Sequence, residues 1–195
     1  MIRSAAIALL VLCAGCQIGD RAHVTVGTAL TPAQEAGLAE VKTFVEATAR
    51  AYNVQPPAIM VADHAWDATA GAIYRRGVII FTSGVLTSAS RDQVVAHELG
   101  HYILRHDQPS SRTSEEQENQ ANIEAVHILQ IGKGLSEEEA LRQVVTALGR
   151  AHRAVKAGAA ITRGHAHPCE EIRAVLAAYP AQRVWSAALE CAPAG

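Results

Sequence analysis

The chain has 195 residues, a length typical of a single domain, and its 49% hydrophobic and 18% charged residues argue against a disordered or low-complexity protein. The formal net charge of −2 argues against a nucleic-acid-binding protein, which would present a basic surface, so no nucleic-acid partner is expected.

The start of the chain has the pattern of an export leader. A positive Arg3 precedes a short apolar run at residues 5–12 and an Ala-Gly pair suited to cleavage. A cysteine directly after that pair resembles the lipobox of bacterial lipoproteins. We therefore expect residues 1–15 to be a signal peptide and Cys16 to carry a lipid. The lipid would anchor the protein in the cell envelope, on the outer membrane facing the periplasm in a Gram-negative host. A plain secretory leader and a retained anchor are the alternatives.

Residues 16–30 lack periodicity and are predicted to form a tether, and the folded domain is predicted to span residues 31–195. Thr31 followed by proline is a typical helix start, and regular apolar spacing continues this helix to about residue 51. Three apolar runs then predict strands, the second and third joined as a β-hairpin: residues 58–62, 72–74 and 78–82.

Four helical segments follow, the last of which starts at Pro168 and is broken near Pro180. The first three each open with a predicted capping box, a serine followed three residues later by Gln or Glu, and run to about residues 105, 130 and 155. The pairs are Ser90 with Gln93, Ser114 with Gln117, and Ser136 with Glu139. The predicted fold class is therefore α+β, a mainly helical domain with a small β-hairpin or sheet beside the first of these helices.

His97, Glu98 and His101 form an HExxH motif inside the helix that starts near Ser90. Positions i and i+4 lie on one face of a helix, so both imidazoles can reach one zinc ion. Glu98 lies beside them, where it can act on a water molecule without binding the metal. The alternative is a pair of ordinary helix histidines, which requires a chance match to a rare pattern. We expect one Zn²⁺ per chain and a zincin-like domain.

A zinc peptidase site needs a third protein ligand. The next predicted helix offers Glu118, and Asn122 on the same face can accept the outer N–H of a ligand histidine. Glu115 and Glu116 compete for the ligand role but lie in the first turn, where acids complement the helix dipole, while Glu124 is off the Glu118 face. A solvated acidic face is the alternative interpretation of the whole run.

These motifs resemble those of the gluzincin metallopeptidases, specifically the HtpX-like and CAAX prenyl protease-like family. The resemblance rests first on VVAHELGHYILRH followed by E-x-x-A-N at Glu118 to Asn122, and it extends over roughly residues 35–180. It implies a zinc-dependent endopeptidase with His97, His101 and Glu118 as ligands and Glu98 as the base. Three further stretches are similar to that family: residues 77–86 to its sheet-edge strand, His106, and His167-Pro168 with Arg173.

The implied mechanism needs a proton carrier and an oxyanion donor. Glu98 would take the proton of the attacking water and deliver it to the leaving amine. The resemblance places His167 beside the zinc, as the oxyanion donor or as a plug of the open position, with His165 and Tyr74 as alternative donors. Ordinary loop histidines and a cross-strand packing role for Tyr74 remain open. The strand at 78–82 would pair with an extended substrate or form plain sheet core.

Two cysteines, Cys169 and Cys191, remain once the leader and the lipidated residue are set aside, and an even pair in an exported chain predicts a disulfide. Two buried thiols are the alternative. The remaining histidines lack partners at metal spacing and are expected on the surface or satisfied in the core: His23, His64, His127 and His152. Trp66 and Trp185 are expected to pack.

The leading functional hypothesis is a zinc-dependent endopeptidase of the cell envelope that acts on unfolded or extended proteins in quality control. The alternative is a non-catalytic zinc-binding envelope chaperone or scaffold lipoprotein. The intact Glu98 favours the enzyme, because a binding module needs no base at that position. A third hypothesis, an intracellular regulator of the metalloprotease type, is disfavoured by the leader.

Overall fold

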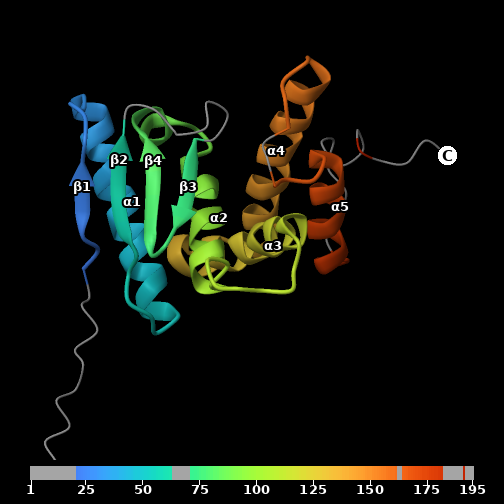
Figure 1. The fold of residues 1–195 in the computed structure, drawn as a ribbon, viewed down its shortest axis with the longest axis horizontal. Coiled ribbons are helices and arrows are strands. Elements are labelled where there is room, and N and C mark those ends of the chain that lie inside the picture. The colour runs from blue at the N-terminus through green and yellow to red at the C-terminus, as the bar shows by residue number, and fades with distance from the viewer. Residues whose placement is uncertain (1–20, 63–70, 162–163, 182–190, 192–195) are drawn as a thin grey trace, which may run out of the picture.

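The computed structural model describes residues 21–62, 71–161, 164–181 and 191, and the fold is given for these ranges. It is α+β, which confirms the predicted class: one four-stranded sheet lies at one side of the molecule and the helices α2 to α5 extend away from it (Figure 1). The strands are β1 Val24–Val26, β2 Ala58–Ala62, β3 Ala72–Arg75 and β4 Val78–Thr82. The helices are α1 Pro32–Ala51, the 3-10 helix η1 Ser83–Thr87, α2 Arg91–Ile103, α3 Ser114–Lys133, α4 Glu137–Lys156 and α5 Pro168–Ala178.

The sheet has the strand order β1-β2-β4-β3. Strands β1, β2 and β4 are parallel, and β3 pairs with β4 as the predicted antiparallel hairpin, with Ile73 opposite Ile80. The hairpin turn uses Arg76 and Gly77 with positive φ values of 50° and 79°, as a tight two-residue turn requires. As a result β3 is an edge strand, and it lies against α2.

The N-terminal segment is not entirely a tether. Val24–Val26 forms a short parallel strand whose register places Val24 beside Ile59, and Gly27 continues the pairing by donating its N–H to the Val61 carbonyl at 2.8 Å. Three residues are too few for an alternating pattern to be visible in the sequence. The pairing arises because β2 offers an open edge of unsatisfied backbone groups.

Helix starts were predicted well in position and less well in chemistry. The predicted capping box at Ser136 is formed, and Thr31 caps α1 as predicted, with Gln34 completing a capping box that was not predicted. Helix α3 is capped by Thr113 with Glu116, one residue earlier than the predicted pair. Ser90 precedes α2 as predicted, yet its side chain makes no capping bond, because its hydroxyl accepts a hydrogen bond from the Arg150 guanidinium instead.

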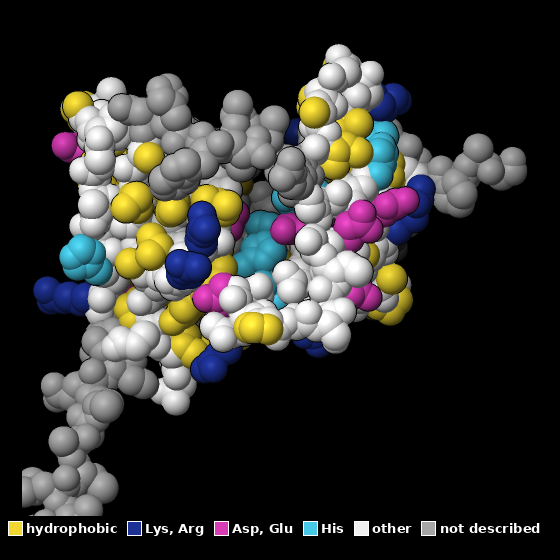
Figure 2. All heavy atoms as spheres, viewed as in Figure 1, with side chains coloured by type: hydrophobic (Ala, Val, Ile, Leu, Met, Phe, Trp, Pro, Cys, Tyr) yellow, Lys and Arg dark blue, Asp and Glu magenta, His cyan; other side chains and the backbone are white. Residues whose placement is uncertain are grey.

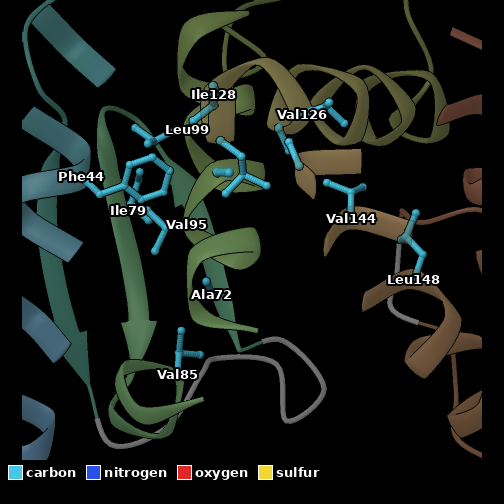
Figure 3. Close-up of a cluster of buried hydrophobic side chains, with 14 of the residues drawn as sticks. Phe44, Ala72, Ile79, Val85, Val95, Leu99, Val126, Ile128, Val144 and Leu148 are labelled. Atoms are coloured by element: carbon cyan, nitrogen blue, oxygen red, sulfur yellow. The ribbon is translucent and has the colours of Figure 1, made fainter. Parts of the chain in front are cut away.

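Helix α2 packs into the hydrophobic core with one face and carries the histidines of the motif on the opposite face. Val95 and Leu99 are fully buried and pack with Phe44 of α1 and Ile79 of β4 (Figure 3). Residues two positions apart on a helix point about 200° away from each other. The core contact of Val95 and Leu99 therefore turns His97 and His101 to the opposite side, toward α3. The hydrophobic core thus sets the direction of the histidines.

Helices α2 and α3 approach each other very closely at Gly100. A Cβ atom added to Gly100 would lie 2.8 Å from the carbonyl oxygen of Ala121, closer than real Cβ atoms come. Glycine therefore permits the contact between the two helix backbones, and Ala121 lies one turn after Glu118. The small residue inside the motif brings the two metal-binding helices together.

A disulfide bond links the start of α5 to a residue near the C-terminus. Cys169, in the first turn of α5, forms a disulfide with Cys191. The second helical piece predicted after Pro180 falls mainly on residues outside the described ranges. None of the helices in the described ranges has both the length and the apolar composition that a membrane span requires.

Candidate metal centre and active site

Three side chains from two helices direct their ligand atoms to one point. His97 Nε2 lies 3.1 Å from His101 Nε2 and 3.0 Å from Glu118 Oε2, and His101 Nε2 lies 3.3 Å from the same carboxylate oxygen. A tetrahedral zinc ion with bonds of about 2.05 Å requires its ligand atoms to lie about 3.3 Å apart. The structure thus brings together the three residues that the sequence singled out as a ligand set.

The chemistry of this triangle fits a metal ion better than it fits a set of hydrogen bonds. Glu118 Oε2 is buried and lacks a hydrogen-bond partner of acceptable geometry, although two imidazole nitrogens lie within 3.3 Å of it. Buried carboxylate oxygens are expensive without compensation. A cation bound between the three atoms would compensate the carboxylate and use both imidazole lone pairs, so the residues present fit zinc.

A second layer of contacts orients the two histidines. Asn122 Oδ1 lies 2.9 Å from His97 Nδ1, so the amide oxygen accepts the outer N–H and leaves Nε2 free to bind a metal. His101 Nδ1 lies 2.9 Å from His106 Nδ1, and His106 Nε2 lies 3.2 Å from Gln120 Oε1. The role of Gln120 was not predicted, because no local pattern links a residue on α3 to a histidine beyond the end of α2.

Glu98 lies next to the ligand triangle without belonging to it. Its side chain is buried, with 7% of its surface exposed, and its carboxylate accepts a hydrogen bond from the backbone N–H of Tyr74 on β3. Burial raises the pKa of Glu98 to about 7, with a further contribution from the charge of Glu118 and an opposing one from His97. The edge strand therefore holds a carboxylate with a raised pKa beside the metal ligands.

Charge coupling within the triangle is strong in the metal-free chain. Burial by itself lowers the pKa of His97, but the close contact with Glu118 and the charge of that carboxylate outweigh it and raise the pKa to about 9. The pKa of Glu118 is held far below its usual range, since its contacts with His101 and His97 outweigh the burial that would raise it. The pKa of His101 is lowered, chiefly by burial. A cation entering this site would displace a proton from His97.

The structure corrects the choice between the two histidines of the Gly-His-Ala-His loop. His165, not His167, lies beside the centre: its ring stacks on His97 with centroids 6.1 Å apart, and its Nδ1 lies 3.1 Å from Glu171 Oε1 and 3.5 Å from Glu118 Oε2. His167 is the N-cap of α5 and its ring contacts His152. Because the two residues alternate along the loop, the capping role of one directs the other to the centre.

Glu171 is a site residue that the sequence did not reveal. It lies in the first turn of α5, is 3% exposed, and accepts the His165 hydrogen bond. Burial alone lowers the pKa of His165, but the hydrogen bond and charge of Glu171 together with the charge of Glu118 raise it. Sequence reasoning assigns first-turn acids to the helix dipole, so nothing local distinguished Glu171 from Glu170.

Tyr74 contributes its backbone rather than its side chain. Its ring packs edge-on against Tyr102 with centroids 5.7 Å apart, and its hydroxyl accepts the Gly77 N–H at 3.3 Å. Burial raises the pKa of Tyr74 to about 12. The side chain therefore has a packing role, but its ring partner lies on α2 and not on the neighbouring strand, as the cross-strand interpretation implied.

Of the two interpretations left open for residues 78–82, substrate pairing and plain sheet core, the structure agrees with sheet core. β4 lies between β2 and β3, so its backbone groups are used within the sheet. The free edge belongs to β3, which also supplies the N–H that reaches Glu98. The predicted strand is confirmed, and its order in the sheet could not be deduced from its own residues.

Two cavities meet at the centre, each lined by Ala72, His97, Glu98 and His165. One, of about 470 Å³, is polar and continues along β3 past Arg75 and Arg76. The other, also of about 470 Å³, is mainly apolar and is lined by alanines of α4 and of the segment after it. Figure 2 shows histidine side chains at the bottom of a hollow between the sheet side and the helical side of the molecule.

The competing carboxylates do not point to the ligand triangle but have other environments. Glu116 completes the capping box of α3, Glu115 lies exposed in the same first turn, and Glu124 accepts a hydrogen bond from the Tyr52 hydroxyl. Four other residues with predicted roles lie outside the described residues: Cys16, His64, Trp66 and Trp185. His152 is not isolated, because it contacts both His167 and Cys169.

The fold and this set of side chains are those of a zinc metallopeptidase-like domain. Residues 56–158 match the family model described as the IrrE N-terminal-like domain, peptidase M78, and the match covers just over half of the chain. The chain therefore belongs to this zinc metallopeptidase-like family. The match supports the predicted class and gives no support to the HtpX-like or CAAX prenyl protease-like assignment. No curated protein and no solved structure matches the chain.

The family match includes β2 to α4 and thus every member of the ligand triangle and Glu98. His165 and Glu171 lie beyond it, His165 in the loop before α5 and Glu171 in the first turn of α5. Their placement at the centre rests on the structure alone.

Proposed function

We propose that the protein is a zinc-dependent endopeptidase of the cell envelope. The observation that carries this proposal is the position of Glu98. It lies beside three converging ligand atoms and against the backbone of β3, on the edge of that strand that no other strand pairs with. A purely structural zinc site would have four protein ligands and no need of a buried carboxylate next to them.

His97, His101 and Glu118 would hold the zinc ion, with Asn122 and His106 orienting the two imidazoles. When bound, zinc supplies Lewis acidity that makes water a better nucleophile and polarises a carbonyl group. The three protein ligands leave one position of a tetrahedral ion for the reaction.

Glu98 is the proton carrier in this proposal. Its carboxylate accepts a proton from the attacking water and then passes it to the nitrogen of the leaving amine. The Tyr74 N–H holds the carboxylate in place, so Glu98 does not need to reorganise between the two transfers.

His165 is the proposed oxyanion donor, in place of His167. Its Nδ1–H is engaged by Glu171, which leaves the Nε2–H of the protonated ring as a donor. The protonated His165 ring would stabilise the negative charge that develops on the carbonyl oxygen of the substrate. Glu171 is a positioning residue, because it acts only through His165.

The geometry suggests how a substrate binds. An extended peptide can add to the free edge of β3 through backbone hydrogen bonds, a mode that selects for unfolded or extended segments. One substrate side chain would enter the apolar cavity beside His97, where alanines leave space for a large aliphatic or aromatic group.

The envelope location rests on the leader pattern of residues 1–15 and on Cys16 as the lipid-bearing residue. The Cys169–Cys191 disulfide supports it, because disulfides persist in oxidising compartments. Quality control of unfolded envelope proteins is the role we propose.

A non-catalytic zinc-binding chaperone or scaffold is the second candidate. The family also includes transcription regulator-like proteins, so membership by itself does not establish hydrolysis. Both candidates bind zinc and both bind extended chains. Only the enzyme requires Glu98.

The deciding experiment compares the wild-type protein with Glu98→Gln on an unfolded protein substrate, with zinc measured in both. We expect Glu98→Gln to keep its zinc and to lose hydrolysis, since Glu98 is beside the metal ligands but is not one of them. Hydrolysis by the variant at the wild-type rate would show that Glu98 is not the general base. Absence of hydrolysis by zinc-loaded wild type, with binding of the substrate retained, would favour the scaffold.

A further inference from the structure

A second group of metal-binding side chains lies between α4 and α5. His152 of α4, His167 at the N-cap of α5 and Cys169 in the first turn of α5 have ligand atoms that all lie within 4.8 Å of one another. His152 Nδ1 is 3.3 Å from Cys169 Sγ, and the His152 and His167 rings meet edge-on with centroids 5.4 Å apart. The group shares no residue with the HExxH centre.

The contacts of this group are weak for a buried polar cluster. His152 and Cys169 are each only 6% exposed, and the contact that the structure gives for His152 Nδ1 is a sulfur atom, a poor hydrogen-bond acceptor. His167 Nδ1 accepts one long hydrogen bond, 3.3 Å from the Cys169 N–H. Buried imidazoles are normally satisfied by stronger partners. Binding of a metal ion by these imidazole nitrogens would therefore replace only weak hydrogen bonds.

Cys169 is already bonded in this structure, to Cys191. A sulfur atom in a disulfide has no negative charge and is a poor ligand, whereas a thiolate is one of the preferred ligands of zinc. The disulfide and a metal bond at Cys169 therefore exclude each other. The redox state of one cysteine decides whether the group can bind a metal.

We propose that His152, His167 and Cys169 form a second zinc site when the Cys169–Cys191 disulfide is reduced. A dithiol reductant supplies two electrons and two protons, so the S–S bond breaks to give two thiols and the reductant becomes a disulfide. Zn²⁺ then displaces the proton of the Cys169 thiol and binds the thiolate with the two imidazoles. The fourth position is taken by water or by the Cys191 thiolate.

The local structure places the sulfur of Cys169 among possible co-ligands. Cys169 lies in the first turn of an eleven-residue helix, at the same end as His167. The nitrogen atoms of the two imidazoles lie within 4.8 Å of its sulfur atom, so the ligands of one ion could come from α4 and from the start of α5.

The site would keep α5 attached when the disulfide is open. Glu171, one turn into α5, holds His165 beside the first centre. The disulfide fixes the start of α5 to Cys191, while a zinc ion would fix it to His152 of α4. The exchange of one link for the other would preserve the position of Glu171 under reducing conditions.

The test counts zinc ions in a matched pair of full-length variants. Cys191→Ser leaves Cys169 unable to form its disulfide, and Cys169→Ser leaves the same number of thiols without the ligand. We expect two zinc ions per chain in Cys191→Ser and one in Cys169→Ser. One zinc ion in both folded variants would overturn the proposal. Addition of His152→Ala to Cys191→Ser should return the count to one.

Cobalt provides a second measurement that is independent of the variants' stability. Wild-type protein loaded with Co²⁺ should gain thiolate-to-cobalt absorption when a phosphine reduces its disulfide, and lose it on reoxidation. Absence of this absorption in reduced wild type would also overturn the site. Neither readout depends on hydrolysis, so the second site and the proposed peptidase activity succeed or fail separately.

Discussion

At the scale of single residues, the histidines and Glu98 of the centre are each held by a partner outside the ligand triangle. Asn122 and His106 orient the two histidines, Glu171 holds His165, and the Tyr74 backbone holds Glu98. A metal ligand held in this way loses little conformational entropy when the metal binds. The ligand geometry is therefore formed before the ion arrives.

Glu118→Ala is expected to abolish stoichiometric zinc binding by the oxidised chain, because it removes one of three converging ligand atoms. Zinc content after desalting, measured by elemental analysis, checks this. Glu124→Ala is the matched control on the same helix: its carboxylate is held by Tyr52, so its removal should cost stability and leave one zinc ion per chain. Loss of zinc from the Glu124 variant but not from the Glu118 variant would show that Glu124, not Glu118, is the third ligand.

His165→Ala is expected to lower the hydrolysis rate by about 10²–10³-fold, the range seen when one oxyanion donor is removed. His167→Ala serves as the control from the same loop, since His167 caps α5 and contacts His152. Rates measured at equal zinc content distinguish the two. A larger loss of hydrolysis rate in the His167 variant would indicate that His167 is the oxyanion donor, and it would contradict the observed loop geometry.

At the scale of secondary-structure elements, the centre depends on how closely α2 and α3 approach. The histidines come from α2 and the carboxylate from α3, and the two backbones meet at Gly100 and Ala121. Since the ligand atoms must converge within a few tenths of an ångström, the distance between the helices is part of the metal site.

Gly100→Ala is expected to destabilise the fold by about 1–3 kcal/mol, because the added methyl group clashes with a helix backbone that cannot move locally. It should also weaken zinc binding, since separation of the helices displaces Glu118. Chemical unfolding and zinc titration measure the two effects. Gly84→Ala is the control: its added Cβ meets no atom within 4 Å, so a change within about 0.5 kcal/mol is expected. Equal behaviour of the two variants would contradict the close-contact argument.

At the scale of the whole molecule, a charged cluster joins three helices on the side of α2 away from the centre. Asp92 lies 2.8 Å from Lys133 Nζ at the end of α3, and Arg91 forms ion pairs with Asp92 and with Glu40 of α1. Lys133 also lies over the Phe44 ring, 4.9 Å from its centroid. The cluster connects the α1 layer to the pair of metal-binding helices.

This cluster gives the fold a predictable acid response. Burial by itself raises the pKa of Asp92, but Lys133 and Arg91 outweigh it and hold the pKa below its usual value of 3.8. Its contribution to stability is therefore complete above about pH 4 and is lost as the pH falls through the lowered folded-state pKa. Asp92→Asn should be less stable than wild type at pH 6, with the difference shrinking below pH 4.

Urea unfolding of metal-free protein at several pH values measures that difference. Glu138→Gln is the control, because Glu138 pairs with Arg142 across exposed side chains and should contribute little at any pH. A constant difference between wild type and Asp92→Asn from pH 6 to pH 3 would contradict the charge argument.

Much of the fold was predictable because its signals are local. The strands at 58–62 and 78–82, the hairpin that joins 72–75 to 78–82, and the capped helices depend on local signals. These signals are alternation, helical spacing and side-chain-to-backbone bonds within a few residues. The short strand Val24–Val26 was not predictable, because a three-residue strand exists only through the edge that it meets. The cap of α3 is Thr113 and not the neighbouring Ser114, because the conformation of the loop before the helix determines which of the two residues becomes the N-cap.

The sequence by itself determined the spacing of His97, Glu98 and His101, because one helix carries all three and its geometry is the same in any fold. It also identified Glu118 and Asn122, since one helix face joins them. Only the tertiary structure decided that β3 rather than β4 presents a free edge. It likewise decided that His165 faces the centre and that His152 lies beside Cys169. These contacts join residues far apart in the chain or on alternating sides of a loop. They depend on how the elements pack, which no local pattern encodes.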